Sequence, residues 1–93
     1  MGIRENLLAG KPRIVEKEVA GVEGRVRLRA MLYGDFKKLL EDDEGDTLAI
    51  SKCVVDESDN PCLSPDDIDR LPMNIKQALV QATLEVNGAA SGN

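Results

Sequence analysis

Strict alternation of arginine and apolar residues over residues 25–30 constrains the fold of this chain more than any other feature. The apolar positions are Val26, Leu28 and Ala30, and the arginines between them are Arg25, Arg27 and Arg29. A period of two places the two sets on opposite faces of a β-strand. A second extended segment, residues 13–19, precedes this strand, and the glycine-rich residues 20–24 predict the turn of an antiparallel hairpin.

Charges on the two segments predict the register of the hairpin. Closing the chain symmetrically over residues 20–24 places Glu18 opposite Arg27 and Glu16 opposite Arg29. Opposite charges that face each other across two strands contribute about 0.2–1 kcal/mol per pair. We therefore interpret the arginine stripe as an ion-paired, solvent-facing side of the hairpin.

A nucleic-acid contact is the alternative interpretation of the same stripe. It is disfavoured because no aromatic residue lies between the arginines to stack on bases. The net charge of −5 also opposes binding to a phosphate backbone. We expect no nucleic-acid partner.

Two short helices are predicted, one on each side of the hairpin. Residues 3–9 form the first, which ends before Gly10. The second follows Gly34, where apolar residues recur at helical spacing at Phe36, Leu39 and Leu40. This second helix is expected to end in the acidic residues 41–46, which predict a solvated loop.

The middle of the chain is expected to hold another helix and then a turn. Thr47 is placed to cap a helix that runs to Val55, whose β-branched final residues leave its end open between helix and strand. Residues 56–61 predict a turn. Its oxygen-bearing side chains resemble those of a calcium loop, but Pro61 stands where that loop needs glycine and Asp67 where it needs glutamate, so we predict no metal site.

The segment Ser64-Pro65-Asp66-Asp67 is the clearest helix start in the chain. Ser64 is expected at the N-cap, with Pro65 in the first helical position and both carboxylates near the positive end of the helix dipole. Pro72 interrupts this helix, and a final helix over residues 73–87 ends at Gly88. Residues 1–88 are thus predicted to form one α+β domain, with an N-terminal antiparallel hairpin and three to four short helices, and residues 89–93 a flexible tail.

The composition excludes several kinds of chemistry. The chain has no histidine and no tryptophan, so an imidazole base and a histidine metal ligand are both ruled out. Serine, threonine and cysteine side chains have no histidine to activate them, and no carboxylate pair stands out. We expect no enzymatic activity and no cofactor. The two cysteines, Cys53 and Cys62, are interpreted as reduced and partly buried. A membrane span is not predicted, because the sequence contains no stretch of about 20 apolar residues.

Charge is distributed unevenly along the chain. Residues 1–40 hold nine lysines and arginines against five acidic residues, whereas residues 41–93 hold three against twelve. Two interpretations stay open: the halves neutralise each other within the folded chain, or they orient a partner or a second copy. In the second case, self-association would use the arginine stripe Arg25, Arg27 and Arg29.

The last helix has two apolar stripes where a surface helix usually has one. At about 100° per residue, the first stripe contains Ile75, Ala78, Leu79, Ala82 and Val86. The second, on nearly the opposite side, contains Met73, Val80 and Leu84. Either the helix is central and covered on both sides, or the second stripe binds an apolar partner. We favour the partner and predict Met73, Val80 and Leu84 as its contacts.

Short motifs in the same order resemble those of a known family. They are the basic hairpin that ends in Arg25–Arg29, the helix start Tyr33–Phe36, the segment Cys53–Ser64, and the closing Ala82–Gly88 with its Leu-x-x-Asn-Gly ending. Together they resemble the tail assembly chaperones of long-tailed bacteriophages and prophages. The chain departs from the family pattern at Ser58–Pro61, where a glycine is common.

The resemblance implies a non-enzymatic protein that binds the phage tape measure protein and keeps it soluble until the tail tube forms. It also implies help in recruiting tail tube subunits, possible homo-oligomers, action in the cytoplasm of the bacterial host, and absence from the mature virion. The chain would correspond to the short form of a pair made by frameshifting. The alternative is a small acidic regulator, similar to an antitoxin or anti-repressor, that blocks one folded partner.

Overall fold

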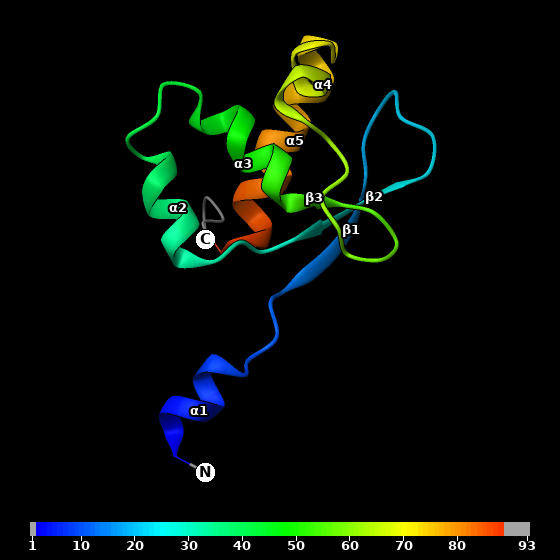
Figure 1. The fold of residues 1–93 in the computed structure, drawn as a ribbon. Coiled ribbons are helices and arrows are strands. Elements are labelled where there is room, and N and C mark those ends of the chain that lie inside the picture. The colour runs from blue at the N-terminus through cyan, green and yellow to red at the C-terminus, as the bar shows by residue number, and fades with distance from the viewer. Residues whose placement is uncertain (1, 89–93) are drawn as a thin grey trace.

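The predicted N-terminal hairpin is present, and a third strand extends it in the computed structural model, which describes residues 2–88. Strands β1 (Ile14–Glu18) and β2 (Arg25–Arg29) pair antiparallel, and β3 (Val54–Val55) pairs antiparallel with the other edge of β2. The helices of the described residues are α1 (Ile3–Leu8), α2 (Tyr33–Leu39), α3 (Gly45–Cys53), α4 (Pro65–Asp69) and α5 (Met73–Val86) (Figure 1). The α+β class and the N-terminal position of the hairpin are confirmed. The predicted tail, residues 89–93, lies outside the described residues.

The hairpin register was predicted incorrectly by two residues. Glu18 lies opposite Arg25, and Glu16 lies opposite Arg27. A shift of two keeps every side chain on its face of the sheet, so acidic and basic residues still oppose each other. Arg27 Nη1 lies 3.3 Å from Glu16 Oε2.

An early chain reversal explains the shift. The backbone N–H of Val22 donates to the carbonyl of Val19 at 3.0 Å, so the tight turn is centred before the middle of the glycine-rich segment. Gly21 has φ +89°, the positive value that the third residue of a type II turn adopts and that glycine tolerates best. The backbone therefore does not turn at the middle of the glycine-rich segment, as the prediction from residues 20–24 assumed.

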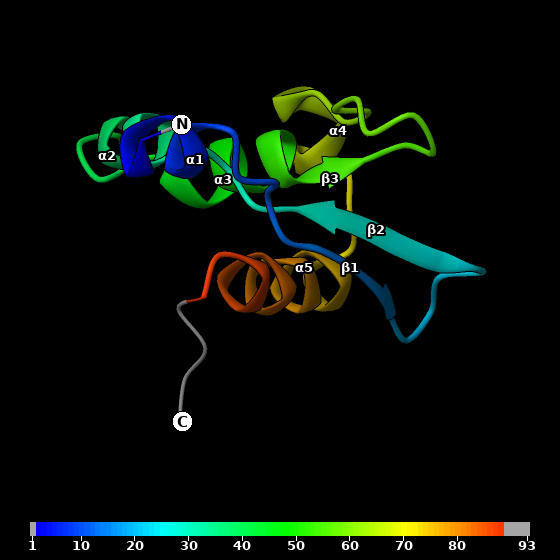
Figure 2. The same ribbon diagram turned by 90° about the horizontal axis from the view of Figure 1, so that it is seen from below.

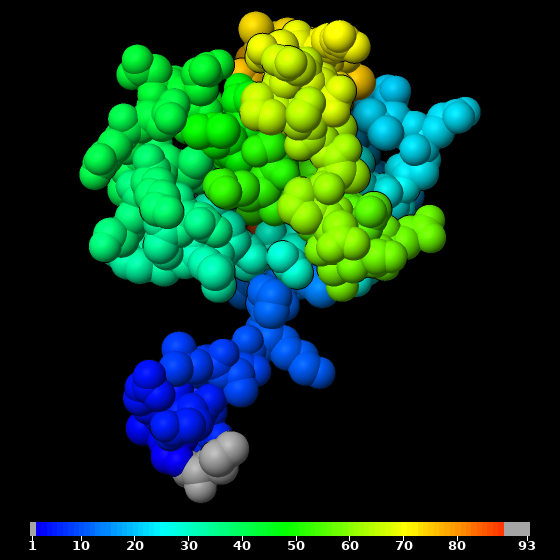
Figure 3. All heavy atoms as spheres, viewed as in Figure 1, coloured from blue at the N-terminus to red at the C-terminus, as the bar shows by residue number. Residues whose placement is uncertain are grey.

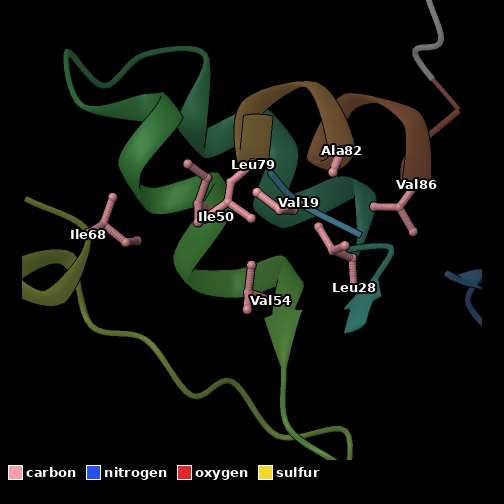
Figure 4. Packing of buried hydrophobic residues seen from close by; sticks show 8 residues of the cluster. All are labelled: Val19, Leu28, Ile50, Val54, Ile68, Leu79, Ala82 and Val86. Carbon is pink, nitrogen blue, oxygen red and sulfur yellow. The ribbon is translucent and has the colours of Figure 1, made fainter. Parts of the chain in front are cut away.

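The core lies between one face of the sheet and helices α3 and α5 (Figures 2 and 4). Its buried members are Val19, Leu28, Ile50, Val54, Ile68, Leu79, Ala82 and Val86. Leu28 of β2 and Val54 of β3 are direct partners across the sheet and point to this face. The first stripe predicted for the last helix supplies three of the buried residues, and it is the stripe that packs the domain.

Helix α3 begins earlier than predicted, and Thr47 is not its cap. Thr47 is buried within the helix, and Glu44 occupies the N-cap without a side-chain hydrogen bond. Gly45 begins the helix because the backbone there passes close to Leu39: a Cβ on Gly45 would lie 2.8 Å from the Leu39 carbonyl oxygen. The acidic loop is therefore shorter than residues 41–46. The end of α3 is resolved as well, since Val54 and Val55 form β3.

Helix α4 begins as predicted. The Asp67 N–H donates to Ser64 Oγ at 3.1 Å, and the Ser64 N–H donates to Asp67 Oδ2 at 3.0 Å, which completes a capping box. These hydrogen bonds with Ser64 hold the pKa of Asp67 below its ordinary value. They stabilise a helix of five residues that is too short to be stable by propensity alone.

Asn87 fastens the C-terminal end of α5 to the sheet and to α3. Its Oδ1 accepts a hydrogen bond from the Met31 N–H at 2.8 Å, just after β2. Its Nδ2 donates to the Thr83 carbonyl at 2.8 Å and lies 3.4 Å from Cys53 Sγ. The helix then ends at Gly88, which has φ +80°, as a C-terminal glycine often does.

Helix α1 forms as predicted but stands away from the rest of the chain (Figures 1 and 3). None of its residues is buried. Residues 9–13 lead from it to β1 without regular secondary structure. Within residues 2–88, no helix combines the length and the apolar content needed to cross a membrane.

Replacing Asp67 by Asn should change the acid sensitivity of the protein. Because the folded-state pKa of Asp67 is lowered from the usual value of about 3.9, its stabilisation is present above that value and is lost as the pH falls through the folded-state pKa. The urea midpoint of Asp67→Asn should lie below that of the unmodified chain at pH 7, and the two should converge as the pH falls through the folded-state pKa of Asp67.

Asp66→Asn is the matched control, because it removes the same charge from the preceding residue, which takes no part in the capping box. Its midpoint should follow the acid dependence of the unmodified chain. Equal pH profiles for the two variants would show that protonation of Asp67 does not change the stability that the capping box contributes.

Replacing Asn87 by Ala should destabilise the fold by about 1–3 kcal/mol, because the half-buried Met31 N–H loses its acceptor. Urea unfolding followed by circular dichroism measures this difference. Asn74→Ala provides the control, since Asn74 is an exposed residue of the same helix, and its effect should stay within about 0.5 kcal/mol. Similar losses in both variants would mean that the Asn87 contacts contribute nothing specific.

Candidate functional site

An apolar groove opens between α2, α3 and the C-terminal half of α5. Its volume is about 690 Å³, and its apolar lining includes Tyr33, Phe36, Leu39, Leu40, Ala49 and Leu84. A concave, mostly apolar pocket is the usual kind of binding site on a protein surface. The groove is therefore the candidate functional site of the chain.

Helix α2 forms one wall of the groove, and only one of its residues is buried. Leu39 packs inward, while Tyr33, Phe36 and Leu40 occupy a helical stripe at spacings of three and four. The Leu40 side chain, which directly follows α2, is 71% exposed. Such exposure of a helix stripe leaves apolar surface in water that a partner could cover.

Acidic residues gather along one side of the groove. Asp46 lines it directly, and the acidic residues 41–44 connect Leu40 to Gly45, which also lines it. On the other side, the ammonium group of Lys37 lies 5.9 Å from the centre of the Tyr33 ring, within reach of a cation–π contact. The rim next to α3 is thus negatively charged.

Thr83 is a buried polar residue in the groove wall. Its side chain lines the groove, yet the residue is only 5% exposed. Among the residues that the structure describes, its Oγ1 has no hydrogen-bond partner. A buried hydroxyl without a partner is costly, so this group should destabilise the folded chain.

The structure separates the three residues predicted from the second stripe of α5. Leu84 lines the groove and is 40% exposed. Val80 is half-buried and packs against the core cluster. Met73 is 70% exposed but lies at the opposite end of α5 from the groove (Figure 1). The second stripe is therefore not fully covered, but its members do not form one surface.

Sequence reasoning missed the contribution of α2 to this site. The spacing of Phe36, Leu39 and Leu40 was used to predict a helix, but its apolar side was assigned to no function. The available signal was the position of Tyr33 and Phe36, which are the only two aromatic residues of the chain and lie on one short helix.

The predicted self-association residues are engaged within the chain to different degrees. Arg27 Nε donates to Asp59 Oδ1 at 2.6 Å, and this hydrogen bond lowers the pKa of Asp59. Arg25 Nη2 lies 3.8 Å from Glu18 Oε2. For Arg29, no ion pair occurs among the described residues. Self-association through this stripe stays a prediction.

Ion pairs join the basic and the acidic half of the folded chain. Arg27 pairs with Asp59, and Lys17 of β1 pairs with Glu85 of α5. Both contacts join the basic N-terminal half to the acidic C-terminal half. The two halves therefore neutralise each other in part, as one of the two interpretations of the charge pattern expected.

The cysteines are both free, but they differ in exposure. Cys53 is buried, and burial raises the pKa of its thiol. Cys62 is exposed, so the expectation that both are partly buried was wrong for this residue. It follows the turn at residues 56–61, where the N–H groups of Ser58 and Asn60 donate to Asp56 Oδ1. Within the described part of the chain, no cluster of three cysteine, aspartate or glutamate residues is placed to hold a metal ion.

Comparison with known protein families, curated proteins and solved structures found no match to this chain. Inference of its function therefore depends on the groove and on the resemblance in its sequence motifs.

Replacing Thr83 by Val tests whether the hydroxyl is unpaired in the free chain. The two side chains have nearly the same shape, so loss of an unpartnered buried hydroxyl should raise the free energy of unfolding by about 1 kcal/mol or more. Thr83→Ser keeps the hydroxyl and removes a methyl group, and it should cost about 1 kcal/mol. A Val variant that is clearly less stable than the unmodified chain would show that the hydroxyl is paired.

Proposed function

We propose that this protein is a non-enzymatic chaperone of phage tail assembly that binds the tape measure protein through the groove between α2, α3 and α5. The observation that carries the proposal is the exposed apolar lining formed by Tyr33, Leu40 and Leu84. The family resemblance of the sequence motifs supplies the identity of the client. In this proposal the chain keeps an extended apolar protein soluble by covering part of it.

An amphipathic helix is the client structure that such a groove accommodates best. Helices bind grooves by inserting apolar side chains spaced three and four residues apart. The apolar residues of α2 and the C-terminal half of α5 offer two helix surfaces that can flank an inserted one. A long client with repeated apolar stripes would bind many copies, each of them with modest affinity.

The acidic rim supports the same function. Residues 41–44 and Asp46 place negative charge beside the groove. This charge favours basic segments of a client and keeps the loaded complex soluble through mutual repulsion.

Further parts of the proposal follow from the resemblance alone. They are the recruitment of tail tube subunits, action in the cytoplasm of the bacterial host and absence from the mature virion. A regulator that blocks a single folded partner would instead form a compact complex of fixed stoichiometry, and sizing of the purified complex separates it from a chaperone that coats an extended client.

Leu40→Asp should reduce the amount of tape measure protein that stays soluble on co-expression with this chain. Burial of a leucine side chain contributes about 1.5–3 kcal/mol, so the dissociation constant should rise about tenfold or more. Because Leu40 is largely exposed within the chain, the free energy of unfolding of the monomer should stay nearly unchanged, as measured at low protein concentration. Leu84→Asp should act in the same direction.

Met73→Asp is the matched control. Met73 is as exposed as Leu40 and receives the same charge, but it lies outside the groove. Its soluble client yield should equal that of the unmodified chain. If Met73→Asp abolishes binding and Leu40→Asp does not, the binding surface is the N-terminal end of α5 around Met73 and the groove is the wrong site. If the unmodified chain never increases soluble client, the chaperone function is wrong.

A further inference from the structure

The N-terminal arm, residues 2–13, carries an apolar helix surface that nothing in the described chain covers. Ile3, Leu7 and Leu8 of α1 are each more than 70% exposed. At about 100° per residue, they lie within one sector of the helix, whereas Glu5 and Asn6 lie on the other side. Figure 3 shows α1 as a separate lobe joined to the body by a narrow neck.

The connector holds α1 off its own body. Arg13 is fixed beside β2, because its carbonyl accepts a hydrogen bond from the Ala30 N–H at 2.9 Å. Pro12 has a restricted φ and biases Lys11 towards an extended conformation. A short, stiff connector opposes folding of the arm back onto its own chain and favours its exchange between copies.

The groove and the arm also match in charge. The arm carries Arg4, Lys11 and Arg13 against the single acidic residue Glu5. The rim of the groove carries Asp46 and the acidic residues 41–44. Arg4 lies in the same helix sector as the apolar residues, so its long side chain can reach the rim while they enter the groove.

We propose that α1 of one copy occupies the groove between α2, α3 and α5 of a second copy, and that the exchange is reciprocal. Two uncovered apolar surfaces of the same chain, oppositely charged at their edges, then cover each other. A reciprocal exchange closes as a twofold dimer and leaves neither surface in water. In the free protein, the groove is thus filled by a neighbour's arm.

The inference does not depend on the proposed function, because it concerns the chain without a client. If both hold, a client helix must displace the arm, and deletion of the arm should tighten client binding. Self-association is measured in the absence of client, so a monomeric protein would refute the exchange and leave the chaperone proposal standing.

The test is the mass of the full-length chain by sedimentation velocity from about 1 to 200 µM, a range that brackets weak to moderate association. The unmodified chain should approach twice its monomer mass of 10.1 kDa. Leu7→Asp in the arm and Leu40→Asp in the groove should each raise the dimer dissociation constant at least about tenfold, since an introduced charge would be buried. Asn6→Asp adds the same charge to the polar side of α1 and should leave the dimer intact.

Mixing the two disruptive variants gives the sharper result. A heterodimer of Leu7→Asp with Leu40→Asp has one intact arm facing one intact groove, so the mixture should form more dimer than either variant alone. A chain that is monomeric at every concentration overturns the proposal. So does a dimer that survives both Leu7→Asp and Leu40→Asp, because its interface would then lie elsewhere.

Discussion

Burial of Leu28 at the centre of the sheet is the contact on which the rest of the structure depends. It is fully buried and faces Val54 across the sheet, beneath α5 (Figure 4). Strand β2 has a neighbouring strand on each edge. Its alternation directs apolar side chains towards α5 and arginine side chains to the opposite face of the sheet. Arg27 on that second side then ties β1 and the turn at residues 56–61 to the same strand through Glu16 and Asp59.

Because the core is built around β2, helix α2 packs against it only loosely. Helix α5 packs on the sheet and α3 packs on α5, whereas α2 contributes only Leu39 to the interior. A chain of 93 residues has little apolar surface to spare, so the exposed stripe on α2 and the exposed side of α1 require a physical explanation. In the two proposals made above, a client covers the stripe on α2 and a second copy covers both surfaces.

Local patterns predicted the elements better than their relations to one another. The capping box at Ser64 and the stop at Gly88 are decided within a few residues, so their prediction needed no tertiary information. Thr47 illustrates the opposite case. It is a good capping residue in isolation, but the helix starts three residues earlier, where Gly45 packs closely against Leu39, and Thr47 is buried. The third strand was equally undecided, because Val54 and Val55 become a strand only by pairing with β2.

The sequence by itself determined the strand alternation, the helix boundaries set by glycine, proline and serine, and the lack of imidazole chemistry, since each depends on residue type or on near neighbours. Only the tertiary structure decided which apolar stripe is buried. Leu84, Val80 and Met73 share a side of α5, yet their surroundings differ. Leu84 lines the groove with residues of α2 and α3, and Val80 packs against the core, whereas Met73 is exposed. Periodicity reports the direction of a side chain around its own helix, whereas the elements that lie opposite it are set by packing between segments far apart in sequence.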